Sequence, residues 1–351
     1  MRTRSRFCST AAAFGVVLLC GVSSCGVSSC GPSSSPPPVV ANIVVDFPGT
    51  TATDPVLLLY SGKEGTTCES FKPSVSSPTI TLNAVTYDPA CAVEMDAFAP
   101  GRGAYANAID PGNPSSDDWF VTAIENGSLS ISLPPLTPVP VRIWVVAAGP
   151  VNIAAAETRR DVQLNKAYPI FEAMGTGLTL DTLSSVLTDT ANVPKRCAEA
   201  DAIAMNPAIY DLSRINVYFL RDYAGILDLT PGWNCWQEGH PEIAFVSWGN
   251  TTLPLPTLAH ELSHALGLMH PKAVGGHTNY TPGFDAFNLM ATNIDVADIS
   301  IGQLYALNFS MDSWLNRTGS PFIRPVVRQC QDIWGAGPCP ALTLFKPGWP
   351  P

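Results

Sequence analysis

The sequence is poor in charge. Charged residues make up only 14% of its 351 residues, and 19 Lys and Arg are outnumbered by 29 Asp and Glu. A chain with a net charge of −10 lacks the basic surface that phosphate binding requires, which argues against nucleic acid as a partner. Hydrophobic residues reach 46%, and this balance excludes an intrinsically disordered chain. The 33 Pro and 27 Gly favour short strands and frequent turns over long helices.

Long hydrophobic runs are also missing beyond the N-terminal segment, so no later stretch is expected to cross a membrane. Residues 1–24 have the layout of a secretory signal peptide, with three Arg ahead of a short apolar run. The tetrapeptide that ends at Cys25 resembles the lipobox of bacterial lipoproteins, whose Cys is acylated, and Cys30 fits the same pattern. Simple export with cleavage near Ser24 is the alternative. Residues 25–38 would carry the anchor and a Ser/Pro-rich tether, and we expect a chain that is lipid-anchored to the bacterial cell envelope or secreted.

Six Cys follow the tether, an even number that favours disulfides in an exported chain over free buried thiols. Six Cys allow 15 pairings. Proximity in the sequence favours the pairs 68–91, 197–235 and 330–339.

Residues 39–135 are expected to form a small all-β, sandwich-like domain. Short apolar or alternating runs, among them 39–47, 55–61, 79–87, 119–124 and 128–133, are separated by Pro, Gly, Asp and Ser, and no helical period of useful length is evident. One loop contains three acidic residues, Asp110, Asp117 and Asp118, which could bind a structural Ca²⁺. A solvated acidic loop is the simpler interpretation. Residues 133–140 are expected to be a linker.

From residue 141 the pattern changes to strands that alternate with helices, which predicts an α+β domain with a mixed twisted sheet. The expected strands are 141–148, 177–180, 214–221 and 242–248. A helix is expected over 154–168 with a kink or stop at Pro169, and another from about Thr257.

The chemistry lies in one motif, H-E-x-x-H-x-x-G-x-x-H, over residues 260–270. Residues i and i+4 share one face of a helix, so His260 and His264 can direct two imidazoles at one metal ion. Gly267 is expected to let the chain turn with a positive φ and return His270 as a third ligand. Three neutral His with an open fourth position suit a catalytic Zn²⁺. Glu261 is not placed to ligate, and is the candidate general base and acid.

This motif resembles that of the metzincin zinc metalloproteases. Residues 287–292 (FNLMAT) resemble their Met-turn, in which Met290 would form an apolar floor under the zinc site; an ordinary core Met is the alternative. A capping box at Ser300 opens a plausible C-terminal helix through Leu315. The resemblance implies the order strand, long helix, strands and zinc helix, in a protease domain over residues 139–351. It also implies that residues 242–248 are the edge strand along which an extended substrate pairs.

The subfamily stays open. The Pro after the third His is similar to serralysins, but Thr292 stands where serralysins and astacins have a Tyr, which favours a three-His site. The segment ending at Cys197 partly resembles the inhibitory Cys motif of matrixins, although a disulfide is preferred. His240 and His277 are expected to lie on the surface or in loops rather than to bind metal.

These features predict a zinc-dependent endopeptidase that acts on proteins or peptides through a zinc-activated water. A cell-surface binding protein with a structural, non-catalytic zinc is the alternative, as is a zinc hydrolase that acts on another kind of amide.

Overall fold

The computed structural model describes residues 39–51, 53–76, 78–88, 90–91, 93–109, 118–173, 175–190, 193, 196–221, 232–235, 243–249, 256–268, 289–290, 299–309, 313–317 and 344–345. By its internal contacts the chain divides into residues 1–37 and 38–351, and only the second unit contains described residues. The predicted signal peptide and the anchor cysteines lie outside them, as do His240, His277, Cys330 and Cys339. None of the described helices is both long and apolar enough to cross a bilayer.

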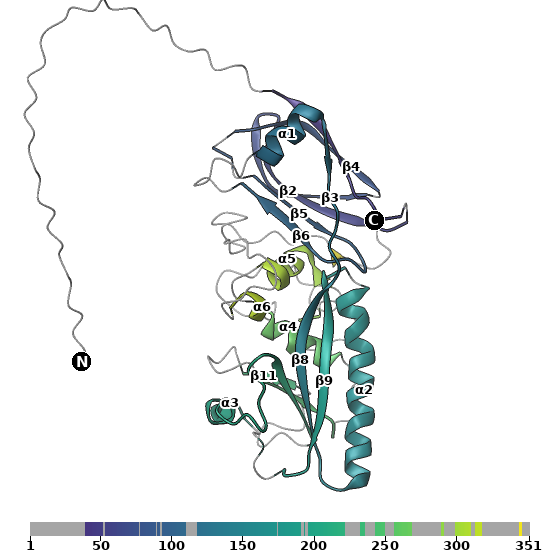
Figure 1. Cartoon of the computed structure of the whole chain (residues 1–351), viewed down its shortest axis with the longest axis vertical. Coiled ribbons are helices and arrows are strands. Elements are labelled where there is room, and N and C mark those ends of the chain that lie inside the picture. The colour runs from purple at the N-terminus through teal and green to yellow at the C-terminus, as the bar shows by residue number, and fades with distance from the viewer. Residues whose placement is uncertain are drawn as a thin grey trace, which may run out of the picture. The chain divides into compact units, whose positions relative to one another are not determined.

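The described part is a mixed α and β structure with two main sheets (Figure 1). The first sheet has seven strands in the order β6-β5-β2-β4-β1-β7, with β3 paired to β2. Its strands are β1 (Ala41–Asp46), β2 (Val56–Glu64), β3 (Thr67–Ser76), β4 (Thr79–Thr86), β5 (Glu94–Phe98), β6 (Tyr105–Ala108) and β7 (Ser128–Ser130).

The first sheet differs from the expected sandwich, because its described strands are hydrogen-bonded into one curled sheet rather than two stacked ones. The cause is β2, whose pairing with β3 shifts register between Tyr60 and Gly62. The first part of β2 pairs with β5, and its last two residues pair with β4. The strand β2 therefore joins β5 and β4 into one sheet around a shared apolar core.

A helix, α1 (Asp118–Asn126), lies where residues 119–124 were expected to form a strand. The expectation was wrong because a short apolar run fits either element. Phe120, Ala123 and Ile124 have helical spacing and are buried against the first sheet. Of the three acids considered for Ca²⁺, Asp118 begins this helix, and Asp110 and Asp117 lie outside the described residues.

The second sheet has five strands in the order β11-β12-β10-β8-β9. The strands β8, β9, β10 and β12 are parallel, and β11 runs antiparallel to β12. They are β8 (Thr137–Val146), β9 (Leu178–Leu187), β10 (Ile215–Leu220), β11 (Gly232–Asn234) and β12 (Ile243–Ser247). Two expectations fail here. The supposed linker 133–140 already contains the start of β8, and β12 is not the edge strand, because β11 pairs with its outer side.

The long helix α2 (Pro150–Glu172) runs beside β8 and β9 (Figure 1). It continues through Pro169, where a kink or stop was expected. A proline removes one backbone donor, and here it lies close to the end of the helix. The next two residues, Ile170 and Phe171, are buried in the core and hold the last turn in place.

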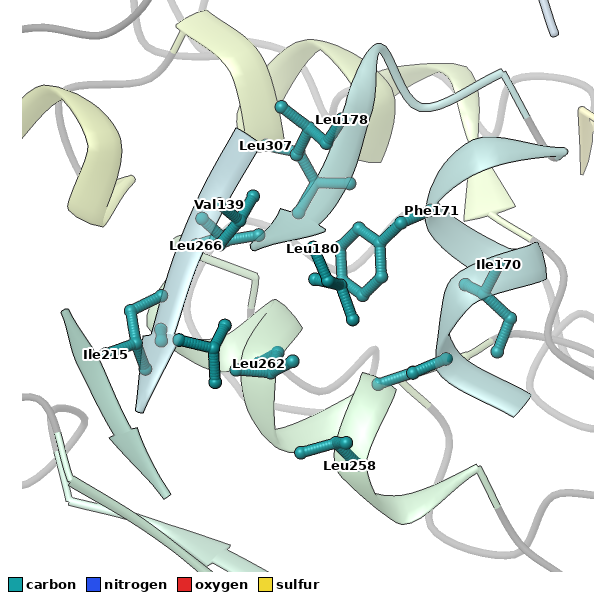
Figure 2. Close-up of a cluster of buried hydrophobic side chains, with 14 of the residues drawn as sticks. Val139, Ile170, Phe171, Leu178, Leu180, Ile215, Leu258, Leu262, Leu266 and Leu307 are labelled. Carbon is teal, nitrogen blue, oxygen red and sulfur yellow. The ribbon is translucent and has the colours of Figure 1, made fainter. Parts of the chain in front are cut away.

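The two faces of the second sheet bury different cores, as expected for a parallel sheet covered on both sides. On one face, side chains of β8, β9 and β10 pack against α2 and against α4 (Thr257–Ala265); Figure 2 shows Phe171 of α2 and Leu262 of α4 pointing into this core. The opposite face packs against the 3₁₀ turn η2 (Cys197–Glu199) and α3 (Ala200–Ala204).

The remaining described elements follow the zinc motif in the chain. The C-terminal helix expected from Ser300 through Leu315 is present only in part, as α5 (Ile301–Phe309). Ser300 ends a short strand, and Ser313 is not helical, so α6 (Trp314–Arg317) is a separate helix beyond it. A short pair of strands, β13 (Ile299–Ser300) and β14 (Leu344–Phe345), completes the set. Two of the expected disulfides are formed, Cys68–Cys91 and Cys197–Cys235.

Candidate metal centre and catalytic residues

The helix α4 carries the first half of the motif, and its amphipathic spacing explains how the site is oriented. Leu258, Leu262 and Leu266 recur at intervals of four and pack into the core, as Figure 2 shows. His260 and His264 share the same interval on a different stripe of the helix. His264 is buried, whereas His260 is half-buried and is the most accessible residue of α4.

The C-terminus of α4 forms the turn that the motif requires. Gly267 has φ +91°, which confirms the expected left-handed position. The Gly267 N–H donates to the carbonyl of His264 at 3.0 Å, and the Leu268 N–H donates to that of Ser263 at 2.9 Å. These two bonds are those of a Schellman motif, and they end the helix directly after the second His.

The two imidazoles lie next to each other and are each oriented by a backbone carbonyl. The ring centroids of His260 and His264 are 4.7 Å apart, and the ring planes are nearly perpendicular. Nδ1 of His264 is 2.7 Å from the carbonyl oxygen of Leu268, and Nδ1 of His260 is 2.7 Å from that of Leu289. Because a carbonyl only accepts, Nδ1 carries the proton in each ring, and the lone pair of Nε2 is left available for a metal ion.

The carbonyl that orients His260 belongs to the predicted Met-turn. Leu289 and Met290 form a turn and are fully buried in the same core as α4. The chain therefore brings the Met290 segment to the first His across 29 positions of sequence. Sequence reasoning named Met290 but not the carbonyl beside it, because a backbone oxygen has no residue-specific signature.

Glu261 is buried between α4 and β11. Its side chain is 4% exposed, and burial raises the pKa of its carboxyl well above its usual range. Among the described residues, Oε2 of Glu261 has no hydrogen-bond partner. A buried carboxylate oxygen without a partner is costly, so this position fits a group that accepts protons from a water or a substrate.

The described residues supply part of the donor set that a zinc ion needs. Two neutral His in a fixed tautomer are ligands of the kind that Zn²⁺ prefers. The described residues do not contain a group of three His, Cys, Asp or Glu close enough to hold a metal. The third predicted ligand, His270, lies outside the described residues, so the described part of the chain supplies two of the three expected ligands.

Three contacts that the sequence did not reveal hold α4 in place. Its N-cap position is Pro256, which makes no side-chain cap, and the Leu258 N–H instead donates to Oε1 of Gln163 in α2 at 3.0 Å. Nδ2 of Asn234 in β11 donates to the carbonyl of Glu261 at 2.9 Å. At the other end, Nη2 of Arg317 in α6 donates to the carbonyl of Ala265 at 2.6 Å.

Comparison with known proteins adds no assignment: no protein-family model matches the sequence, and a search of curated proteins found no match.

Proposed function

We propose that the chain is a zinc-dependent endopeptidase that hydrolyses peptide bonds, with Glu261 as general base and then general acid. One observation carries this proposal. His260 and His264 have adjacent rings whose tautomers are set by backbone carbonyls, and the residue between them in the motif is a buried glutamate.

The roles of the residues follow from this arrangement. Zn²⁺ held by His260, His264 and, by the motif, His270 would lower the pKa of a water molecule and polarise the scissile carbonyl. Glu261 would accept the proton of the attacking water and deliver it to the leaving amine. Burial raises the pKa of the Glu261 carboxyl, which makes its carboxylate a stronger proton acceptor. The first step needs this carboxylate ionised, and the positive charge of a Zn²⁺ ion held beside it would favour the ionised form.

A polypeptide substrate is supported by the strand next to the site. The resemblance to metzincins assigns substrate pairing to an edge strand, and among the described strands the edge beside α4 is β11 rather than β12. The outer edge of β11 would offer its backbone N–H and C=O groups to an extended chain, which is the usual way a sheet edge binds peptide.

The experiment is cleavage of an unstructured protein such as casein by the wild-type chain and by Glu261→Ala, each with and without a zinc chelator. We expect cleavage by the wild-type protein alone. Activity of Glu261→Ala above a few per cent of wild type would contradict the role of this residue. One bound zinc per chain without cleavage would instead support the alternative, a binding protein in which zinc stabilises the fold.

We also propose that export and a lipid anchor place this activity at the cell envelope, with acylation of Cys25 or, by the same pattern, of Cys30. The support is the lipobox-like sequence ahead of a Ser/Pro-rich tether. Mass spectrometry of the mature N-terminus checks this, and an unmodified N-terminus would contradict the anchor.

A further inference from the structure

The strand β11 passes directly against Glu261. A Cβ atom added at Gly232 would lie 2.5 Å from Oε1 of Glu261 and 2.8 Å from its Cγ. Two residues further on, Nδ2 of Asn234 donates to the carbonyl of Glu261. Residues i and i+2 of a strand face the same side, so one face of β11 contacts both the carboxylate arm and the backbone of the same residue.

Contacts outside α4 fix the position of β11. Gly232 lies opposite Val246 and Asn234 lies opposite Ala244 in the antiparallel pairing with β12. Directly after the strand, the Cys235 N–H donates to the carbonyl of Ile243 at 2.9 Å, and Cys235 is disulfide-bonded to Cys197. A three-residue strand is thus held by the sheet along its length and by a covalent bond at its end.

We propose that Gly232 and Asn234 are positioning residues for Glu261, and this inference rests on the proposed function. Gly232 leaves room for the carboxylate arm where a larger side chain would displace it, and Asn234 bonds to the backbone that carries the arm. A free glutamate side chain samples many rotamers, and a displacement of about 1 Å at a reacting group can cost up to about 100-fold in rate. A glycine is needed at this position for steric reasons, because the φ of Gly232 is not in the left-handed region.

The first test needs no activity. Thermal unfolding of the metal-free protein is measured for Gly232→Ala in the wild-type and in the Glu261→Ala background. We expect a fall in Tm on the order of 5 °C in the wild type, from overpacking against the glutamate. In the Glu261→Ala background the fall should be at most half as large, because Cγ and Oε1 are gone. The added methyl also approaches Cγ2 of Thr257, at 2.6 Å, and equal falls in both backgrounds would overturn the inference.

The second test separates positioning from metal binding. Gly232→Ala and the near-isosteric Asn234→Leu are each measured for zinc affinity and for kcat and KM on casein. We expect zinc affinity and KM close to wild type in both variants and a kcat at least about tenfold lower. A parallel loss of zinc affinity and kcat would overturn the inference, because it would mean that β11 supports the whole helix rather than Glu261.

Failure of this inference can be told apart from failure of the proposed function. If the wild-type chain cleaves nothing, the proposed function fails, and the unfolding cycle still decides whether Gly232 acts on Glu261. If Gly232→Ala does not fold, Asn234→Leu decides the question by its zinc affinity and kcat.

Discussion

The two described disulfides should contribute similar stability and differ in their effect on activity. Cys197–Cys235 joins residues 38 positions apart, and Cys68–Cys91 joins residues 23 positions apart. In the chain-entropy model, loops of these lengths stabilise the folded state by about 3.9 and about 3.4 kcal/mol at 25 °C. Replacing either pair with alanine should therefore lower the free energy of unfolding by a similar amount, measured by urea titration of each double variant beside the wild type.

Activity should separate the two variants. Cys235 directly follows Asn234, which bonds to the backbone of Glu261, whereas Cys68 and Cys91 lie in or beside the first sheet. At a temperature at which both variants stay folded, the Cys68/Cys91 variant should cleave casein close to the wild-type rate. The Cys197/Cys235 variant should lose at least about tenfold in kcat, because β11 loses its covalent anchor. Equal kcat values in the two variants, with both folded, would refute this reasoning.

Three further predictions concern the elements around the site. Gln163→Met removes the acceptor for the Leu258 N–H and should lower the free energy of unfolding by about 1 kcal/mol, as the loss of a helix cap does. Gln163→Glu keeps an acceptor and should lower it by less. Equal losses of the two variants in urea unfolding would contradict the capping role. Phe171→Ala should cost about 3–5 kcal/mol, because the ring is fully buried between α2 and the sheet, and a cost below about 1 kcal/mol would mean that the ring is not packed there. Burial raises the pKa of Asp211, but hydrogen bonds from Ser213 and neighbouring arginine charges outweigh it, so its pKa is lowered. A carboxyl whose pKa is lowered by folding stabilises the protein above about pH 4, and this stabilisation is lost as the pH falls through the folded pKa. The difference in free energy of unfolding between wild type and Asp211→Asn should therefore shrink in acid. A difference that stays constant with pH would contradict this.

Long buried runs and a spaced motif were predictable from the sequence. The cores of β8, β10 and β12 are apolar stretches of the kind that a parallel sheet buries on both faces. The position of α4 followed from the i, i+4 spacing of its two His, and the turn after it followed from Gly267. Proximity in the sequence also predicted the two described disulfides.

Features that depend on distant partners were not predictable. The run 119–124 is a helix because its apolar residues meet the first sheet, which no local pattern records. The helix α2 continues through Pro169 because Ile170 and Phe171 are buried beyond it. The three residues of β11 are too few to show a strand period, so β12 was mistaken for the edge.

In the candidate site, too, some residues were predictable from the sequence and others were not. Residue type and spacing were enough to propose the two His of α4 and Glu261 as the site. Their supports come from residues about 27 to 95 positions away, through an amide, a backbone carbonyl or the absence of a side chain at Gly232. Such groups have no chemical signature that sets them apart in a sequence.

The central claim is tested most directly by adding zinc to metal-free protein while casein cleavage is followed. Cleavage should be absent without metal and should rise in proportion to added zinc until one equivalent per chain is bound. His264→Ala, which loses a proposed zinc ligand carried by α4, should not recover cleavage at that concentration. Cleavage that persists after complete removal of zinc, or one bound zinc per chain that restores no cleavage, would show that the protein is not a zinc-dependent endopeptidase.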